Sequence, residues 1–160
     1  MASNHFDSGG NARMVDVSDK PPTRRQASAV ATIRMSTAAA EMVRSGTGKK
    51  GDVLAVARLA AINGTKWTSH LIPLCHAIPI EAVEVEFDWE DNSGANPSLR
   101  CQVTCRTTGK TGIEMEALTG ASVGVLTVYD MLKSVDRAME IGAVYLLQKS
   151  GGVSGDFRRP

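Results

Sequence analysis

Two stretches of strictly alternating residues constrain the fold of this chain more than any other feature. In Ile80–Trp89 four apolar side chains alternate with three carboxylates, and in Leu99–Thr107 four apolar side chains alternate with polar and basic ones. A period of two is typical of a half-buried β-strand. The turn-forming sequence DNSGANP separates the stretches, and an acidic strand pairs well with a basic one. The two stretches therefore predict an antiparallel hairpin with one polar face. This face is either exposed to solvent or a surface where subunits meet.

The remaining segments predict helices and strands around this hairpin. Ser36 and Gly46 bracket a short helix as its N-cap and its C-terminal glycine. Asp52 caps a longer helix, which the Asn63-Gly64 pair weakens near its end. The expected buried face of this helix is its apolar set at helical spacing: Val53, Val56, Leu59, Ala60 and Ile62. The other expected elements are a strand over Ala27–Arg34, a long apolar helix from about Glu116 to Met139 and a last strand over Ala143–Gln148. Together they predict an α+β fold with helices packed on one face of an antiparallel sheet.

Length and charge narrow the class of protein. The 160 residues suit one domain, which we expect to span residues 14–160 after a mobile, Gly- and Ser-rich tail over residues 1–13. With 18 Lys and Arg against 17 Asp and Glu and only 4% aromatic residues, neither a nucleic-acid nor a membrane partner is expected. The polar start MASNHFDSGG lacks a signal-peptide core. We therefore expect a cytoplasmic protein.

The cysteines also favour a location in the cytoplasm. Three cysteines are an odd number, which suits a reducing environment better than a disulfide scaffold. Cys101 and Cys105 alternate with polar residues in one predicted strand and are interpreted as core thiols. The spacing of Cys and His residues does not match a zinc motif, so no metal site is expected.

One segment carries most of the predicted chemistry. Glu114 and Glu116 stand at a turn into the long apolar helix, and Asp130 and Lys133 share one face of that helix three residues apart. An acid and an amine in apolar surroundings shift each other's protonation, as functional sites often require. The alternative is an ordinary surface salt bridge on an amphipathic helix.

Further cations and a histidine lie on loops and at helix ends. Lys50 precedes the N-cap of the second helix, Lys66 lies near the end of that helix, and His76 stands between two prolines. Lys149 begins the glycine-rich sequence KSGGVSG, whose amides can form an anion-binding nest. Each feature also has a structural or solvated alternative. Together they suit a phosphorylated small molecule handled by acid–base chemistry.

Six motifs then resemble a known family, the cyclic pyranopterin monophosphate synthases of molybdenum cofactor biosynthesis. In chain order they are MVDVS (Met14–Ser18), KGDVLAVAR (Lys50–Arg58), LIPLCH (Leu71–His76), TGKTGIEMEALT (Thr108–Thr119), TVYDMLK (Thr127–Lys133) and KSGGVSG (Lys149–Gly155). The resemblance implies a ferredoxin-like α+β fold and a homohexamer, a trimer of dimers with active sites at subunit interfaces. The implied substrate is 3′,8-cyclo-7,8-dihydroguanosine 5′-triphosphate, made from GTP by a radical S-adenosylmethionine enzyme. The implied products are cyclic pyranopterin monophosphate and pyrophosphate.

The resemblance also implies site residues. Asp130 and Lys133 are expected to be the catalytic acid–base pair, with Lys50, Lys66, His76 and Glu116 as further active-site groups. The expected substrate contacts are Leu74, Cys75, His76, Glu114, Met115, Glu116 and Lys149, the last with phosphate. No electrons are exchanged, so no redox cofactor is expected, although Mg²⁺ can accompany the triphosphate.

The chain departs from the family pattern at a few positions. Asn63-Gly64-Thr65 and Trp67 replace small helix formers and an arginine, and Val153 stands where lysine is usual. The last change removes one expected phosphate contact. A rival interpretation is a binding module, a nucleotide-binding or interaction protein that keeps the fold without the chemistry. The intact set of Asp130, Lys133, His76 and Glu116 argues against it.

Overall fold

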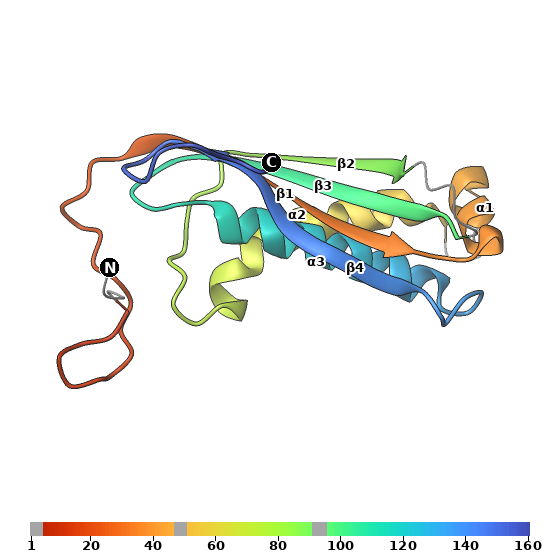
Figure 1. Cartoon of the computed structure of the whole chain (residues 1–160), viewed down its shortest axis with the longest axis horizontal. Coiled ribbons are helices and arrows are strands. Elements are labelled where there is room, and N and C mark those ends of the chain that lie inside the picture. The colour runs from red at the N-terminus through yellow and green to blue at the C-terminus, as the bar shows by residue number, and fades with distance from the viewer. Residues whose placement is uncertain (1–4, 47–50, 91–95) are drawn as a thin grey trace.

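A computed structural model describes residues 5–46, 51–90 and 96–160 of the chain. The elements follow the order β-α-α-β-β-α-β-β along the chain (Figure 1). They are β1 (Thr23–Arg34), α1 (Thr37–Ser45), α2 (Val53–Leu71), β2 (Ala82–Glu90), β3 (Ser98–Gly109), α3 (Glu114–Leu132), β4 (Glu140–Ser150) and β5 (Phe157–Arg158). The predicted α+β class is confirmed.

The strands form one antiparallel sheet in the order β2-β3-β1-β4-β5. Because β3 lies between β1 and β2, and β1 lies between β3 and β4, the chain makes the split β-α-β crossovers of a ferredoxin-like fold. The short helix α1 and the edge strand β5 are additions to it. The predicted hairpin is β2 with β3, and its polar face carries the ion pairs Arg106–Glu84 at 2.8 Å and Arg100–Asp88 at 3.8 Å.

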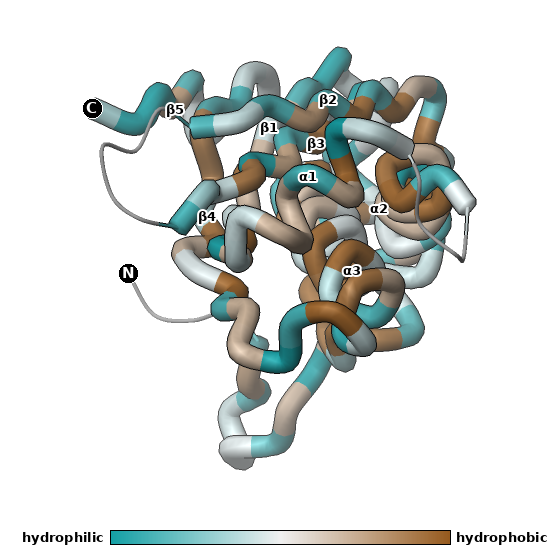
Figure 2. Tube along the Cα trace, turned by 90° about the vertical axis from the view of Figure 1, so that its right-hand side faces the viewer, coloured by the Kyte–Doolittle hydropathy of each residue, from teal (hydrophilic) through white to brown (hydrophobic). Residues whose placement is uncertain are grey.

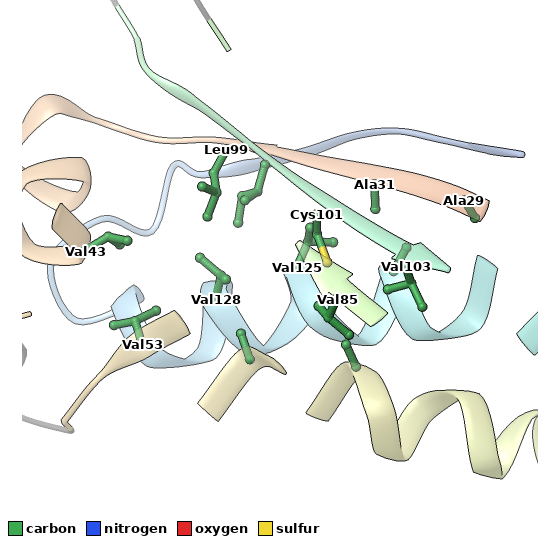
Figure 3. Close-up of a cluster of buried hydrophobic side chains, with 14 of the residues drawn as sticks. Ala29, Ala31, Val43, Val53, Val85, Leu99, Cys101, Val103, Val125 and Val128 are labelled. Carbon is green, nitrogen blue, oxygen red and sulfur yellow. The ribbon is translucent and has the colours of Figure 1, made fainter. Parts of the chain in front are cut away.

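The core lies between one face of the sheet and the two long helices, α2 and α3 (Figure 1). Leu99, Cys101 and Val103 of β3 face Val125 and Val128 of α3 (Figure 3). Hydropathy is correspondingly high along α3 in Figure 2. Burial raises the pKa of Cys101 and Cys105 to about 12, so both stay protonated and inert, as predicted for core thiols.

Small residues let α2 approach α3 closely. A Cβ added at Gly64 would lie 2.9 Å from Val123, and one at Gly120 would lie 2.6 Å from Thr65. This packing is the reason why α2 continues past Asn63-Gly64 to Leu71, where helix propensity alone predicts weakening. The expected buried face of α2 is wrong in part, because Leu59 is 68% exposed and the small residues face inward.

The predicted end of the long helix at Met139 is also wrong, because α3 ends at Leu132. The backbone N–H groups of Val135 and Asp136 both bond to the carbonyl of Leu132, which turns the chain. The Asp136 carboxylate then accepts hydrogen bonds from the N–H groups of Ser36 and Ala138. Met139 lies buried in the core beyond this turn.

Residues 5–13, for which composition predicts a mobile tail, form a tight turn. The Asp7 carboxylate accepts hydrogen bonds from the N–H groups of Gly9 and Asn11, and a β-bridge joins Phe6 to Ala12.

Among the described helices none is long and apolar enough to cross a membrane.

We predict that Gly120→Ala destabilises the fold. The new methyl group would press on Thr65 and the carbonyl of Ala61, and overpacking of this kind costs ~1–3 kcal/mol. The better helix propensity of Ala returns up to ~1 kcal/mol, so the free energy of unfolding should fall, by up to about 2 kcal/mol after that gain, in urea titration. Gly109→Ala is the control, since its nearest neighbour would be 3.7 Å away. Equal stability of the Gly120 variant and wild type would contradict the tight helix contact.

Candidate functional site

A cavity of about 390 Å³ opens at the N-terminal end of α3. Its walls come from the connection between α2 and β2, the first turn of α3 and the N-terminal segment. Six residues of the predicted substrate-contacting set line it: Leu74, Cys75, His76, Glu114, Met115 and Glu116. The structure therefore brings together two motifs that lie about forty positions apart in the sequence.

Glu116 is the buried acid of this cavity. Its residue surface is only 3% exposed, and burial raises the pKa of its carboxyl above the ordinary value. The thiols of Cys75 and Cys105 lie close enough that the charge of Glu116, after burial, also raises their pKa. A carboxyl group with a raised pKa can exchange protons nearer to neutral pH than an exposed one, which general acid–base catalysis requires.

Glu114 points to a different neighbour. Its carboxylate accepts from the Lys149 ammonium of β4 at 2.9 Å, and both side chains are partly buried. Glu114 and Glu116 also occupy the first turn of α3, where the helix dipole favours negative charge. The predicted phosphate contact Lys149 thus lies beside the predicted substrate contact Glu114, at the edge of the cavity that Glu114 lines.

Arg25 was not predicted from the sequence, although it organises this edge. Its guanidinium donates hydrogen bonds from Nε to the carbonyl of Gly109 at 3.0 Å and from Nη2 to that of Lys110 at 3.3 Å. A side chain at Gly152, which has φ of +82°, would collide with the same guanidinium. Arg25 therefore bonds to the end of β3 and the start of the loop before α3, and its guanidinium lies close against Gly152 after β4. No spacing in the sequence marks this role, because it depends on backbone atoms from distant segments.

His76 contacts the N-terminal segment across the cavity. Its Nε2 lies 2.8 Å from the carbonyl oxygen of Val15. Because a carbonyl only accepts, Nε2 carries a proton and donates it in this hydrogen bond.

Lys66 lies outside this cavity. It lines a second opening of about 390 Å³ with Ile62, Glu81 and their neighbours, and its side chain is exposed. Ile78 lines both openings, so the two are adjacent and separated by the α2–β2 connection.

Asp130 and Lys133 lie at the opposite end of α3 from the cavity. The Lys133 ammonium donates to the Asp130 carboxylate at 2.6 Å, and the side chains are 52% and 60% exposed, respectively. Asp130 follows Glu116 by fourteen positions on the helix, which is about 21 Å along the axis. The prediction that Asp130 and Lys133 lie in apolar surroundings is therefore wrong for the single chain, in which they form a surface ion pair. Lys50 lies outside the described residues.

The arrangement combines a buried carboxyl group, an imidazole and a lysine at the rim of one concave site. Such groups can transfer protons and bind an anionic ligand. Within the described ranges, no group of three His, Cys, Asp or Glu residues is placed to hold a metal ion.

A family model described as the MoaC family matches residues 14–152. A protein of Rhodopirellula baltica named cyclic pyranopterin monophosphate synthase is 65% identical over 163 aligned positions. The alignment covers 98% of this chain and 93% of that relative.

We predict that Glu116→Gln stabilises the protein at neutral pH while it lowers activity. Since burial raises the pKa of Glu116, the folded chain binds this proton more tightly than the unfolded chain does. The charged carboxylate therefore destabilises the fold above its raised pKa, and the penalty disappears as the pH falls toward the ordinary value of 4.5.

The measurement is the free energy of unfolding against pH, from about pH 8 downward. The variant should exceed wild type at the upper end, and the two curves should converge on acidification. Glu114→Gln is the control, because it breaks an ion pair and removes no unfavourable buried charge. A Glu116 variant that is less stable than wild type at about pH 8 would show that the carboxylate is not destabilising there.

Proposed function

The chain belongs to the MoaC family, and we propose that it converts 3′,8-cyclo-7,8-dihydroguanosine 5′-triphosphate to cyclic pyranopterin monophosphate. Pyrophosphate is released, and the product serves molybdenum cofactor biosynthesis. The observation that carries this function is the 65% identity, over nearly the whole chain, to a relative with that name. The cavity at the start of α3 supports it, because it offers a buried acid and cations for a phosphorylated substrate.

The reaction requires protons to move in both directions. A ribosyl–purine linkage opens, a pterin ring forms, and a hydroxyl group attacks the α-phosphate while pyrophosphate leaves. We assign proton transfer to Glu116 and His76 in the cavity and to the Asp130–Lys133 pair, with Lys133 as general acid and Asp130 as its partner. Lys149 is assigned to phosphate, where its charge stabilises the leaving pyrophosphate.

Two further lysines belong to the proposed site through the family resemblance. Lys66 lies beside the cavity, across Ile78, from where a long side chain can turn toward a bound ligand. Lys50 is assigned to the site only because its motif, KGDVLAVAR, resembles the family. Mg²⁺ is expected to arrive with the triphosphate as part of the substrate.

We also propose that the complete site needs two copies of the chain. About 21 Å of rigid helix separates Glu116 from Asp130, so one chain cannot present both to a single substrate. A homohexamer built as a trimer of dimers would place one end of α3 beside the cavity of a partner. Exposed apolar side chains on α2, such as Leu59 and Trp67, favour such contacts.

The cellular setting follows from the chemistry. A radical S-adenosylmethionine enzyme acting on GTP must supply the cyclised triphosphate, and we expect both proteins in the cytoplasm. The alternative, a nucleotide-binding module, would bind the triphosphate and release no pyrophosphate.

Turnover of the cyclised triphosphate by wild type and by Asp130→Ala tests the enzyme function. Wild type should release pyrophosphate and form a product with pterin fluorescence after oxidation. The variant should lose at least about 100-fold in rate, since general acid–base groups contribute 10²–10⁴-fold. Glu41→Ala, an exposed carboxylate on α1, is the control and should retain the wild-type rate. Binding without turnover in wild type would favour the binding module.

Mixing two inactive variants tests the shared site. Glu116→Gln and Lys133→Ala should each be inactive alone, because each damages every site. After co-refolding, random pairing places both intact halves together at about one quarter of the sites, and this share of wild-type activity should return. Each single variant refolded with itself is the control. A mixture as inactive as its components would contradict a site shared between copies.

A further inference from the structure

The N-terminal segment lies across the cavity instead of extending away from it. Between the turn at residues 5–13 and β1, residues 14–20 run along the cavity, and His76 of the α2–β2 connection bonds to this stretch. Val15, Val17 and Lys20 of this stretch line the cavity. We call residues 14–20 the strap.

Polar contacts at two points fasten the strap. His76 on the α2–β2 connection donates to the carbonyl of Val15 at 2.8 Å, and the Lys110 ammonium donates to the carbonyl of Ser18 at 2.6 Å. Asp16 lies between these points, where hydrogen bonds from Ser18 and then the charges of Lys110 and His76 lower the pKa of its carboxyl.

The strap is held weakly compared with the core. Val15 and Val17 are only half-buried, and the remaining strap residues are exposed. A segment with few buried apolar contacts opens at a small free-energy cost. The Pro21-Pro22 pair, whose fixed φ angles stiffen the chain before β1, provides a firm point from which the strap can swing.

We propose that the strap closes the cavity over the substrate and that Lys20 is a further substrate-binding residue. The inference rests on the proposed function, which makes the ligand a triphosphate. Lys149, the cation at the edge of the cavity, is already paired with Glu114, so a phosphorylated ligand needs a further positive charge. Lys20, which lines the cavity from the strap, supplies that charge. Closure also removes water, which strengthens every electrostatic contact inside.

Cys75 is a natural reporter for strap opening. It lies half-buried on the cavity wall, whereas Cys101 and Cys105 are fully buried and should not react. Alkylation of Cys75 by iodoacetamide should therefore become faster when the strap opens. Lys110→Met removes one fastening point, and we expect the alkylation rate to rise roughly fivefold. Arg13→Met is the control, because it removes an exposed cation just outside the strap, and its rate should equal that of wild type.

The role of Lys20 is tested with GTP as the probe, by calorimetry on the full chain. Lys20→Met should weaken GTP binding by about tenfold, Lys20→Arg should restore it, and Arg13→Met should bind as wild type does. In turnover assays Lys20→Met should raise KM more than it lowers kcat, which a loss of structure would not produce.

The outcomes separate the strap from the reaction. Unchanged Cys75 alkylation in Lys110→Met overturns the strap, and unchanged GTP affinity in Lys20→Met overturns the role of Lys20. If both respond as expected while wild type does not turn over the cyclised triphosphate, the proposed reaction fails and the strap stands.

Discussion

The close packing of α3 against α2 fixes the helix that carries the acidic residues of the proposed chemistry, Glu114, Glu116 and Asp130. Gly64 and Gly120 remove side chains at the contact, so the two helices approach until backbone meets side chain. Since α3 cannot shift along its partner, its first turn holds Glu116 beside the α2–β2 connection. The same rigid helix carries Asp130 to the far end. A change in this contact would therefore move both halves of the proposed chemistry at once.

Electrostatics then distinguishes the two ends of α3. At the start, burial raises the pKa of Glu116 and favours its protonated form, although the helix dipole favours the charge. At the end, solvent screens the ion pair of Asp130 and Lys133, which contributes little to stability. Stability thus explains neither arrangement. A destabilising buried acid and a nearly neutral surface pair are more easily understood as functional groups.

Local patterns in the sequence predicted much of the fold and less of the site. Alternation predicted the hairpin, and the caps Ser36 and Asp52 marked where α1 and α2 begin, because these signals act within a few residues. The continuation of α2 through Gly64 was not predictable, since it depends on α3. The hydrogen bonds of Arg25 to Gly109 and of His76 to Val15 in the strap were not predictable either. Both use backbone carbonyl groups from distant segments, and no sequence pattern indicates such contacts.

The separation of the predicted residues is itself informative. The segments that carry Leu74, His76 and Glu116 converge in one chain, whereas Asp130 shares its helix with Glu116 and so cannot approach it. Folding brings together residues on different elements, but it holds residues on one helix at a fixed distance. Chemistry that uses both ends of α3 on one substrate therefore requires a second copy, and the exposed position of the Asp130–Lys133 pair is what such an assembly needs. The fold of one chain supplies the cavity, and association would supply the remaining acid–base pair.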